Sequence, residues 1–519
     1  MVVSPIQKRN MFLFFLMMMA VGLSLSKPLI TLGEICIGVL WLFDGNIKTN
    51  ILNFFRNKIA IILSSVYLLT VLGLLHTSNF DFAFDDLRRK LPLLLLPFLF
   101  SGFEPLNKKE FELLFKVFVV GVVASSLWSI FVMLGGLEEI PVDKRDLSRF
   151  TSHIRFGLMV AFSIIGAAYY FFNERLLKQK IVWAITSLWL FVFLFILHLI
   201  TGIVVFFITI TLLLFLLGIK HRKMGVKIIT LGITLVIVAL SFGYVYNCYH
   251  DFYVANNIEP MPMYEYSPRG EKLFHDTISS NSERKENGNY VYRNVARKEL
   301  ENSWNKRSEI KLDSIDLKGQ HIRFTLMRFI TSKGLLKTAD AVEQLTEEEI
   351  KAIERGVANY KYLDMNMIEL RLHKIFWEIE MFKKYNVADG HSVMLRWLYW
   401  KTGFEIIKEH PIIGVGTGDV QDVFNEKHQA NGIVSEKYWR RAHNQYLTYF
   451  ITYGVIGGIY FLFFLFYPIV KQNRTNDLLY VSFFSIVLLS MLTEDTLETQ
   501  VGITFFAFFN TLLILKKQA

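Results

Sequence analysis

Residues 202–219 read GIVVFFITITLLLFLLGI, a run without a single charged side chain. A helix needs roughly 20 apolar residues to cross the hydrocarbon core of a bilayer, where it satisfies its own backbone hydrogen bonds. A short basic segment containing Lys220, Arg222 and Lys223 follows, and a second mostly apolar run occupies 226–246. This pattern predicts two transmembrane helices joined by a short basic loop.

Ten further apolar blocks occur along the chain. They lie at 11–25, 29–43, 59–76, 90–102, 112–134, 154–173, 181–199, 444–470, 477–492 and 499–516. The block at 90–102 is short and contains two prolines, and the blocks 181–199 and 202–219 nearly touch. Because 53% of the 519 residues are hydrophobic and gather in these blocks, we predict an all-α polytopic membrane protein of about 12 transmembrane helices.

The net charge of +10 resides mainly in short loops between the blocks, which argues against nucleic-acid binding and for a membrane orientation. With twelve spans these basic loops share the side of the N-terminus, and the positive-inside rule makes that side the cytoplasm. The basic residues concerned are Lys8, Arg9, Lys48, Arg56, Lys58, Lys108, Lys109, Arg175, Lys178, Lys180, Lys220, Arg222, Lys223, Lys471, Arg474, Lys516 and Lys517. We expect a bacterial inner-membrane protein with both termini cytoplasmic and a large periplasmic loop.

The opposite short loops are more acidic. They are expected to contain Asp81, Asp85, Asp86, Glu138, Glu139 and Asp143. The first apolar block follows Lys8 and Arg9 as in a signal peptide, but no small-residue cleavage site follows it, so it is interpreted as a span. Cys36 and Cys248 do not form a disulfide framework, so the outer loop is expected to depend on ordinary packing.

The predicted organisation has three parts. Residues 1–246 form an N-terminal bundle of about nine spans, 247–443 the periplasmic loop, and 444–519 a C-terminal bundle of about three spans. Within the loop, 259–390 is expected to be a mostly helical insertion. Thr346 followed by Glu349 is a capping box, and a longer helical pattern covers 365–385. Such charged, capped helices are typical of a solvated accessory domain.

Residues 391–443 have a different character. Residues 391–409 have the pattern of an amphipathic helix, which His410 and Pro411 end, and a second amphipathic stretch covers 420–427. Between them lies the glycine-rich sequence GVGTGD at 414–419. This sequence lacks the preceding strand that a nucleotide site needs, so we interpret it as a turn and not as a phosphate loop.

The sequence YWRRAHNQYL at 438–447 directly precedes a long apolar run. Arg440, Arg441 and His443 therefore stand where the chain enters the membrane from outside. One interpretation is an anchor, because Tyr and Trp lie at membrane interfaces and Arg binds lipid headgroups. The other is functional, with His443 as a base beside an anion-binding arginine pair.

Three further features are expected on the same outer face. Arg155, in the segment SHIRFG at 152–157, opens a span, where an arginine is costly unless it faces a polar cavity; snorkelling to the interface is the alternative. Arg396 lies on the amphipathic helix, and Glu494, Asp495 and Glu498 occupy the turn between the last two spans, where a hydrophilic cap is the simpler account. Together they suit a lipid-linked anion such as a pyrophosphate. No set of residues with metal-ligand spacing occurs.

Several of these stretches are similar to the signature of the O-antigen ligase/polymerase superfamily. They are Arg396-Trp397, Gly403, HPIIGVGTG at 410–418, RAHNQYL at 441–447 and YGVIG at 453–457. The SHIRFG segment, TSKGL at 331–335 and IERGVAN at 353–359 resemble members from Bacteroides-like bacteria. The resemblance spans about 150–510, and the 259–390 insertion is larger than the loop of many members.

The resemblance implies a C-type glycosyltransferase-like membrane enzyme that uses neither a nucleotide sugar nor a metal or other cofactor. Its donor would be a glycan on undecaprenyl pyrophosphate and its acceptor, in a ligase, a sugar hydroxyl of lipid A–core. His443 would be the base, and Arg155 and Arg396, with Arg440 or Arg441 helping, would bind the pyrophosphate. The supporting residues implied are Asn444, Glu494 and Gln500.

Other functions stay open at this point. Within the superfamily they are polymerisation of repeat units and transfer of the glycan to a protein. A flippase or transporter for lipid-linked glycans would instead favour charges deep in several spans and inverted repeats. A non-catalytic membrane scaffold that displays the outer domain is the remaining alternative.

Overall fold

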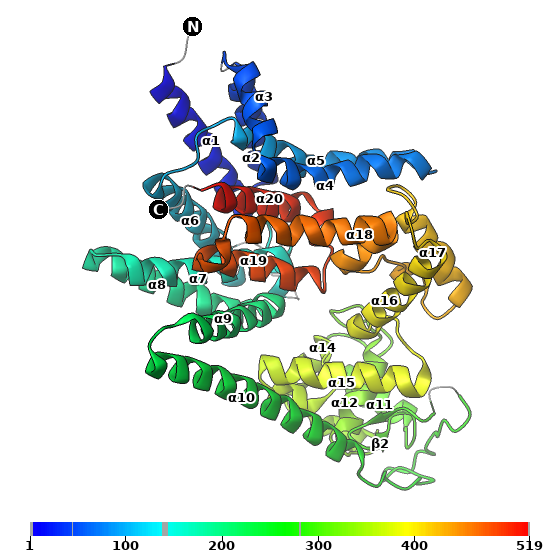
Figure 1. Cartoon of the computed structure of the whole chain (residues 1–519). Coiled ribbons are helices and arrows are strands. Elements are labelled where there is room, and N and C mark those ends of the chain that lie inside the picture. Colours follow the sequence, from blue (N-terminus) through cyan, green and yellow to red (C-terminus); the bar gives the residue numbers. More distant parts are fainter. Residues whose placement is uncertain (1–3, 44, 137–143, 280–281, 517–519) are drawn as a thin grey trace. The chain divides into compact units, whose positions relative to one another are not determined.

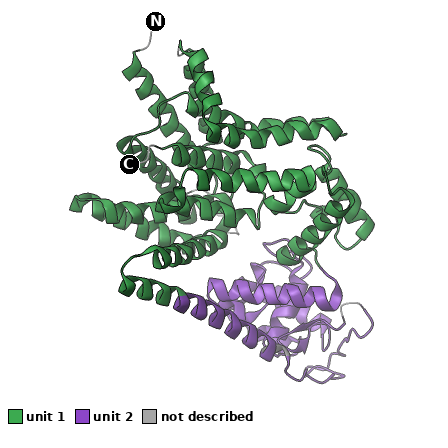
Figure 2. Ribbon diagram, in the orientation of Figure 1, with its two compact units in different colours: residues 1–234, 388–519 green, residues 235–387 purple. Residues whose placement is uncertain are grey.

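The computed structural model describes residues 4–43, 45–136, 144–279 and 282–516. These form two compact units, one of residues 1–234 with 388–519 and the other of residues 235–387 (Figure 2). The first unit contains most of the apolar helices, and the second is inserted in the sequence between its two segments.

The first unit is helical throughout (Figure 1). Its helices are α1 (Pro5–Leu25), α2 (Lys27–Leu42), α3 (Ile47–Arg56), α4 (Lys58–Leu72), α5 (Phe80–Ser101), α6 (Lys108–Met133), α7 (His153–Asn173), α8 (Leu177–Ile196), α9 (Ile200–Lys220), the start of α10 (Met224–Asn256), α16 (Ser392–Glu409), α17 (Val420–Asn431), α18 (Gln445–Lys471), α19 (Leu478–Met491) and α20 (Gln500–Leu515). Short 3-10 turns follow α4 (Gly73–His76), precede α7 (Lys144–Leu147) and α18 (Glu436–Tyr438), and join α18 to α19 (Arg474–Asn476) and α19 to α20 (Thr496–Glu498).

All twelve predicted apolar blocks lie in helices, and the chain is an all-α polytopic membrane protein. Among the described residues, eight helices are long and apolar enough to cross a membrane, or nine if the bent pair α2–α3 is one span. Helices α19 and α20 are apolar but shorter. The number of twelve spans therefore stays a prediction.

Two predicted boundaries are wrong. Helix α5 begins at Phe80, so Asp81, Asp85 and Asp86 belong to a helix and not to a loop. The cause is local, because the Asn79 side chain accepts a hydrogen bond from the backbone N–H of Phe82 and caps the helix. Helix α10 also continues to Asn256, well beyond the predicted end at 246.

A glycine-dependent contact holds the loop after α16 against α18. Helix α18 is interrupted at Gly454, whose φ of 63° is in the left-handed region. Here the N–H of Val455 donates to the carbonyl of Pro411 (2.8 Å), and the N–H of Val415 donates to that of Ile451 (3.0 Å). The N–H of Gly416 donates to Thr452 (3.0 Å). The backbone amides of Val415 and Gly416 are therefore occupied by bonds to α18. The glycine-rich sequence 414–419 forms a turn, as predicted.

Replacing Gly454 by alanine should destabilise this contact. A Cβ at this position would lie 2.2 Å from the carbonyl oxygen of Ile412, and the left-handed φ adds strain of roughly 1–3 kcal/mol. We expect a lower Tm of the detergent-solubilised protein. Gly225→Ala is the matched control, because nothing lies within 4 Å of its Cβ, and an equal Tm for both variants would contradict the prediction.

The second unit is a small helical domain with one hairpin. Besides the end of α10 it contains β1 (Lys285–Glu286), β2 (Asn289–Tyr290), α11 (Arg297–Arg307), α12 (Ile322–Ser332), α13 (Ala339–Glu343), α14 (Glu347–Glu354), a 3-10 turn (Tyr360–Leu363) and α15 (Met367–Tyr385). The predicted capping box at Thr346 and the helix over 365–385 are confirmed. Trp304 and Phe329 are fully buried in its core. Lys337 is also buried, which lowers its pKa to about 7, and its Nζ donates to the carbonyls of Tyr290 and Arg293.

Candidate functional site

The turn between α19 and α20 holds three carboxylates that are withdrawn from solvent. Glu494, Asp495 and Glu498 have exposed fractions of 7%, 8% and 4%. A hydrophilic cap facing water would leave such side chains exposed, so that interpretation does not fit. Buried carboxylates require charged or hydrogen-bonding partners, and the surrounding helices supply them.

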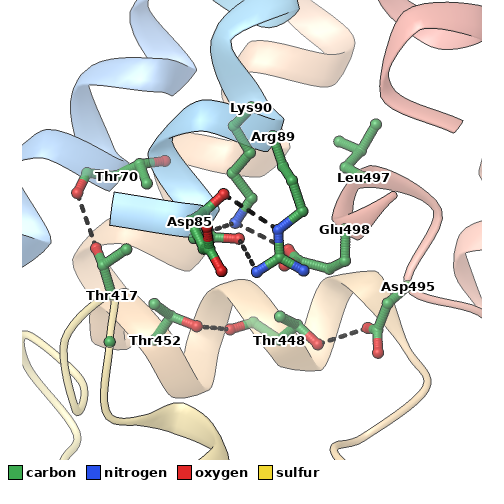
Figure 3. A network of polar contacts seen from close by, with 12 residues as sticks. Thr70, Asp85, Arg89, Lys90, Thr417, Thr448, Thr452, Asp495, Leu497 and Glu498 are labelled. Atoms are coloured by element: carbon green, nitrogen blue, oxygen red, sulfur yellow. Dashed lines mark hydrogen bonds and ion pairs between the residues drawn. The ribbon is translucent and has the colours of Figure 1, made fainter. Parts of the chain in front are cut away.

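Glu498 lies between two cations (Figure 3 shows its ion pair with Lys90). Its Oε1 is 2.9 Å from the Nζ of Lys90 on α5, and its Oε2 is 3.4 Å from the Nη1 of Arg441. The same ammonium group lies 2.7 Å from Oδ2 of Asp86, one helical turn earlier. Burial alone would raise the pKa of Glu498, but Lys90 and Arg441 outweigh it and bring the pKa to about 2. The carboxylate is therefore charged.

The start of α18 is fastened to the same turn by polar side chains. Gln445 accepts a hydrogen bond from the N–H of Leu497 at 2.6 Å. Thr448 donates to Asp495 at 2.7 Å, as Figure 3 shows. Asn444 caps α18 by accepting from the N–H of Leu447 and donates to the carbonyl of Leu492. These bonds fix the position of the residue just before the cap, which is His443.

His443 is half-buried and has a left-handed backbone (φ 47°), an uncommon conformation for a residue other than glycine. Its ring centroid lies 5.9 Å from that of Tyr399 on α16. Burial lowers the pKa of His443 below its ordinary value of 6.5, and the charges of Asp495 and Glu494 oppose that shift in part. At neutral pH the imidazole is therefore uncharged and able to accept a proton.

Arg396 on α16 is fixed on the same turn. Its Nη2 lies 2.8 Å from Oε1 of Glu494, and its Nε donates to the carbonyl of Thr493 at 3.3 Å. Its side chain is 30% exposed, so this guanidinium is paired and also accessible. That combination suits a group that exchanges one anionic partner for another.

Arg155, at the start of α7, differs from Arg396 and Arg441. Its Nη1 donates to the hydroxyl of Ser152 at 3.0 Å, and the structure gives it no ion pair among the described residues. Its Nε is buried and has no hydrogen-bond partner among the residues that the structure describes. An unpaired buried donor is costly, and an anion beside it would remove the cost.

The remaining predicted residues lie apart from this cluster. Arg440 is exposed and donates to the carbonyl of Trp439, so of the two neighbouring arginines it is Arg441 that faces the buried carboxylates. Gln500 donates to Thr31 on α2 at 2.8 Å, and no contact joins it to His443 among the described residues.

Sequence reasoning missed Lys90, Asp86, Tyr399 and Gln445. The signal for the first two was a lysine at the start of an apolar block with an aspartate four residues earlier. This spacing places both side chains on one helix face. An ionisable pair at the edge of a span is a functional candidate by default.

The arrangement brings together a neutral histidine, three buried carboxylates, Arg396 and Arg441, and the charges of Glu494 and Asp495 also act on Arg155. It can accept a proton, stabilise the resulting imidazolium through Asp495 and Glu494, and bind an anion through Arg155 and Arg396. Among the residues that the structure describes, no group of histidine, cysteine, aspartate or glutamate side chains could hold a metal ion.

Fold and cluster together define a polytopic α-helical membrane protein with a charged site where several apolar helices end. Residues 347–462 match the family model described as O-Antigen ligase, which confirms the resemblance to the O-antigen ligase superfamily. The matched segment includes Arg396, Arg441 and His443. No match is found among curated proteins. The family indicates a glycosyl-transferring enzyme of the O-antigen ligase or polymerase kind, active in lipopolysaccharide biosynthesis.

Proposed function

We propose that this protein transfers an O-antigen-type glycan from undecaprenyl pyrophosphate to a sugar hydroxyl of lipid A–core at the periplasmic face of the inner membrane. One observation carries the proposal. His443, a neutral, half-buried base, lies beside the turn whose Glu494 binds Arg396, inside the segment that matches the family. This residue set suits an acceptor hydroxyl on one side and a diphosphate on the other.

In the proposed step, a ring nitrogen of His443 takes the proton of the acceptor hydroxyl as its oxygen attacks the anomeric carbon of the donor. The new carbon–oxygen bond forms while the bond from that carbon to the pyrophosphate breaks. Undecaprenyl pyrophosphate leaves with the bonding electrons, and the anomeric carbon is inverted. Asp495 and Glu494 favour the imidazolium, which later releases its proton to water.

Arg155 and Arg396 would stabilise the charge that develops on the departing pyrophosphate, usually the largest electrostatic contribution to such a reaction. Arg155 has no ion pair among the described residues, so it can bind the donor pyrophosphate without first breaking an ion pair with a carboxylate. Arg396 would share its guanidinium between Glu494 and the phosphate. Arg441 keeps Glu498 and hence the turn in place. The step uses no metal ion.

The placement in the membrane is part of the proposal. Twelve spans put the basic loops in the cytoplasm, and they put the loop 247–443, which includes α16 and α17, in the periplasm, where lipid-linked glycans are displayed. The second unit would then be accessory to the site. The apolar blocks and the distribution of Lys and Arg support this orientation.

Loss of the gene distinguishes the ligase from its nearest relatives in function. We expect cells without this protein to accumulate lipid-linked polymer and to carry lipid A–core without O-antigen. Core that still carries a single repeat unit would contradict ligation and indicate a polymerase. Unchanged lipopolysaccharide would contradict both.

Replacing Arg155 by glutamine should lower kcat/KM for transfer by roughly 10²–10³-fold, the loss typical for removal of one donor to a developing negative charge. Arg155→Lys should retain an intermediate activity, because an ammonium keeps the charge but not the planar fork of donors. The control is Arg149→Gln, an exposed arginine nearby. Activity of Arg155→Gln within twofold of wild type would refute this role.

The pH profile of kcat/KM should have its acid limb below pH 6.5. The uncharged imidazole is the active form, and burial lowers the pKa of His443, so activity persists as the pH falls to 6.5 and is lost below it. Asp495→Asn removes a negative charge that favours the imidazolium, so it should lower the pKa of His443 and shift the acid limb to lower pH. A limb at or above pH 6.5 in the wild type would contradict the prediction.

A further inference from the structure

A cavity of about 850 Å³ lies at the ends of five helices, away from the candidate site. It is bordered by the end of α3, the start of α4, the end of α5, the end of α18 and the end of α20. The candidate site lies at the opposite ends of two of these helices, at the start of α18 and in the turn that precedes α20. If these helices cross the bilayer, the cavity opens near the opposite membrane surface.

Four cations line this cavity: Arg56, Lys58, Lys471 and Lys516. The structure gives none of them an ion pair among the described residues. Lys471 and the pair Arg56 and Lys58 are exposed, and the only acidic residue in the lining is Glu104. With four cations and one carboxylate, the lining of the cavity carries a net positive charge.

The rest of the lining is largely apolar. Phe100, Phe103 and Leu106 are buried side chains that border the cavity, and Leu515 closes it on the α20 side. Thr511 also lines it, is only 1% exposed, and its hydroxyl oxygen has no hydrogen-bond partner in the described part of the chain. A buried polar atom of this kind calls for a polar ligand atom.

We propose that this cavity binds one anionic phospholipid, with its phosphate among the four cations. Its glycerol oxygens would lie near Thr511, and its acyl chains would follow the apolar lining toward the bilayer. Basic pockets between transmembrane helices at the cytoplasmic surface bind anionic lipid headgroups. A free phosphate shares the charge but leaves the apolar part of the cavity unused, so the lining favours a lipid. The inference does not depend on glycan transfer.

The test is native mass spectrometry of the full chain in detergent, titrated with phosphatidylglycerol or with phosphatidylcholine of the same acyl chains. Wild type should bind phosphatidylglycerol much more strongly. The variant Arg56→Gln/Lys58→Gln/Lys471→Gln/Lys516→Gln should bind it roughly tenfold more weakly or worse, because each cation near a lipid surface contributes to the attraction. The single exposed change Lys471→Glu should weaken it measurably without endangering the fold.

The matched control is Arg175→Gln/Lys178→Gln/Arg222→Gln/Lys223→Gln, which also removes four cations, all of them exposed and outside the cavity. It should bind phosphatidylglycerol within twofold of wild type. Equal binding of the two lipids by wild type, or undiminished phosphatidylglycerol binding by both cavity variants, would overturn the proposal. Displacement of the lipid by an equal concentration of inorganic phosphate would show a phosphate site and overturn it as well.

Discussion

The variant His443→Asn should transfer glycan with a kcat lowered by roughly 10²–10⁴-fold, the usual contribution of a general base. Asparagine is the informative substitution, because it tolerates the left-handed backbone that this position requires. It therefore removes the base without adding backbone strain. The Asn444 cap and the Gln445 bond to the α19–α20 turn should stay in place.

Initial rates of glycan transfer by the purified variant give the measurement, together with its Tm. His410→Asn is the control, because His410 is exposed at the end of α16 and is outside the cluster around His443. We expect its rate to equal that of wild type. A rate for His443→Asn within a few-fold of wild type, at an unchanged Tm, would mean that another group takes the proton.

Lys90→Met should reduce the free energy of unfolding by roughly 3–5 kcal/mol, the cost of removing one partner of a buried ion pair. Lys90 and both of its carboxylate partners, Asp86 and Glu498, are almost fully buried. The substitution would leave Asp86 with the 3.6 Å contact to Arg89, and Glu498 with the 3.4 Å contact to Arg441 and a 3.3 Å hydrogen bond from Gln445.

Lys116→Met supplies the comparison. Like Lys90→Met, it removes an i, i+4 pair of a lysine and a carboxylate from an apolar helix, but the pair of Lys116 with Glu112 is solvent-accessible and should contribute about 0–1 kcal/mol. Adding Asp86→Asn to Lys90→Met should restore part of the stability, because the carboxylate with the weaker remaining ion pair is then uncharged. Equal losses for Lys90→Met and Lys116→Met in detergent unfolding would contradict the account.

Much of the fold could be predicted because its determinants are local. Apolar runs such as 202–219 identify helices by composition, and the capping box at Thr346 identifies the start of α14. The start of α5 was missed although its determinant, the Asn79 cap, is also local. Its first turns contain Asp81, Asp85 and Asp86, and such an acidic cluster between apolar runs is more typical of a loop than of a helix.

The sequence indicated most residues of the candidate site, but not the ion pairs and hydrogen bonds that these residues form. His443, Arg396 and Arg155 stood out because charged residues beside apolar runs are uncommon. Their partners come from segments far away in the chain, and a sequence pattern does not encode such pairing. Thus Glu494 pairs with Arg396, whereas Arg155 has no ion pair among the described residues. Gln500, chosen for its position before a span, is directed to α2 instead.

The central claim is that this chain moves a glycan from undecaprenyl pyrophosphate to lipid A–core. The most direct measurement quantifies both products when the purified chain, in a bilayer, receives the lipid-linked glycan and lipid A–core. The account predicts core-linked glycan and free undecaprenyl pyrophosphate in equal amounts, with the anomeric configuration inverted. Longer lipid-linked chains without core-linked product, or no release of undecaprenyl pyrophosphate, would contradict it.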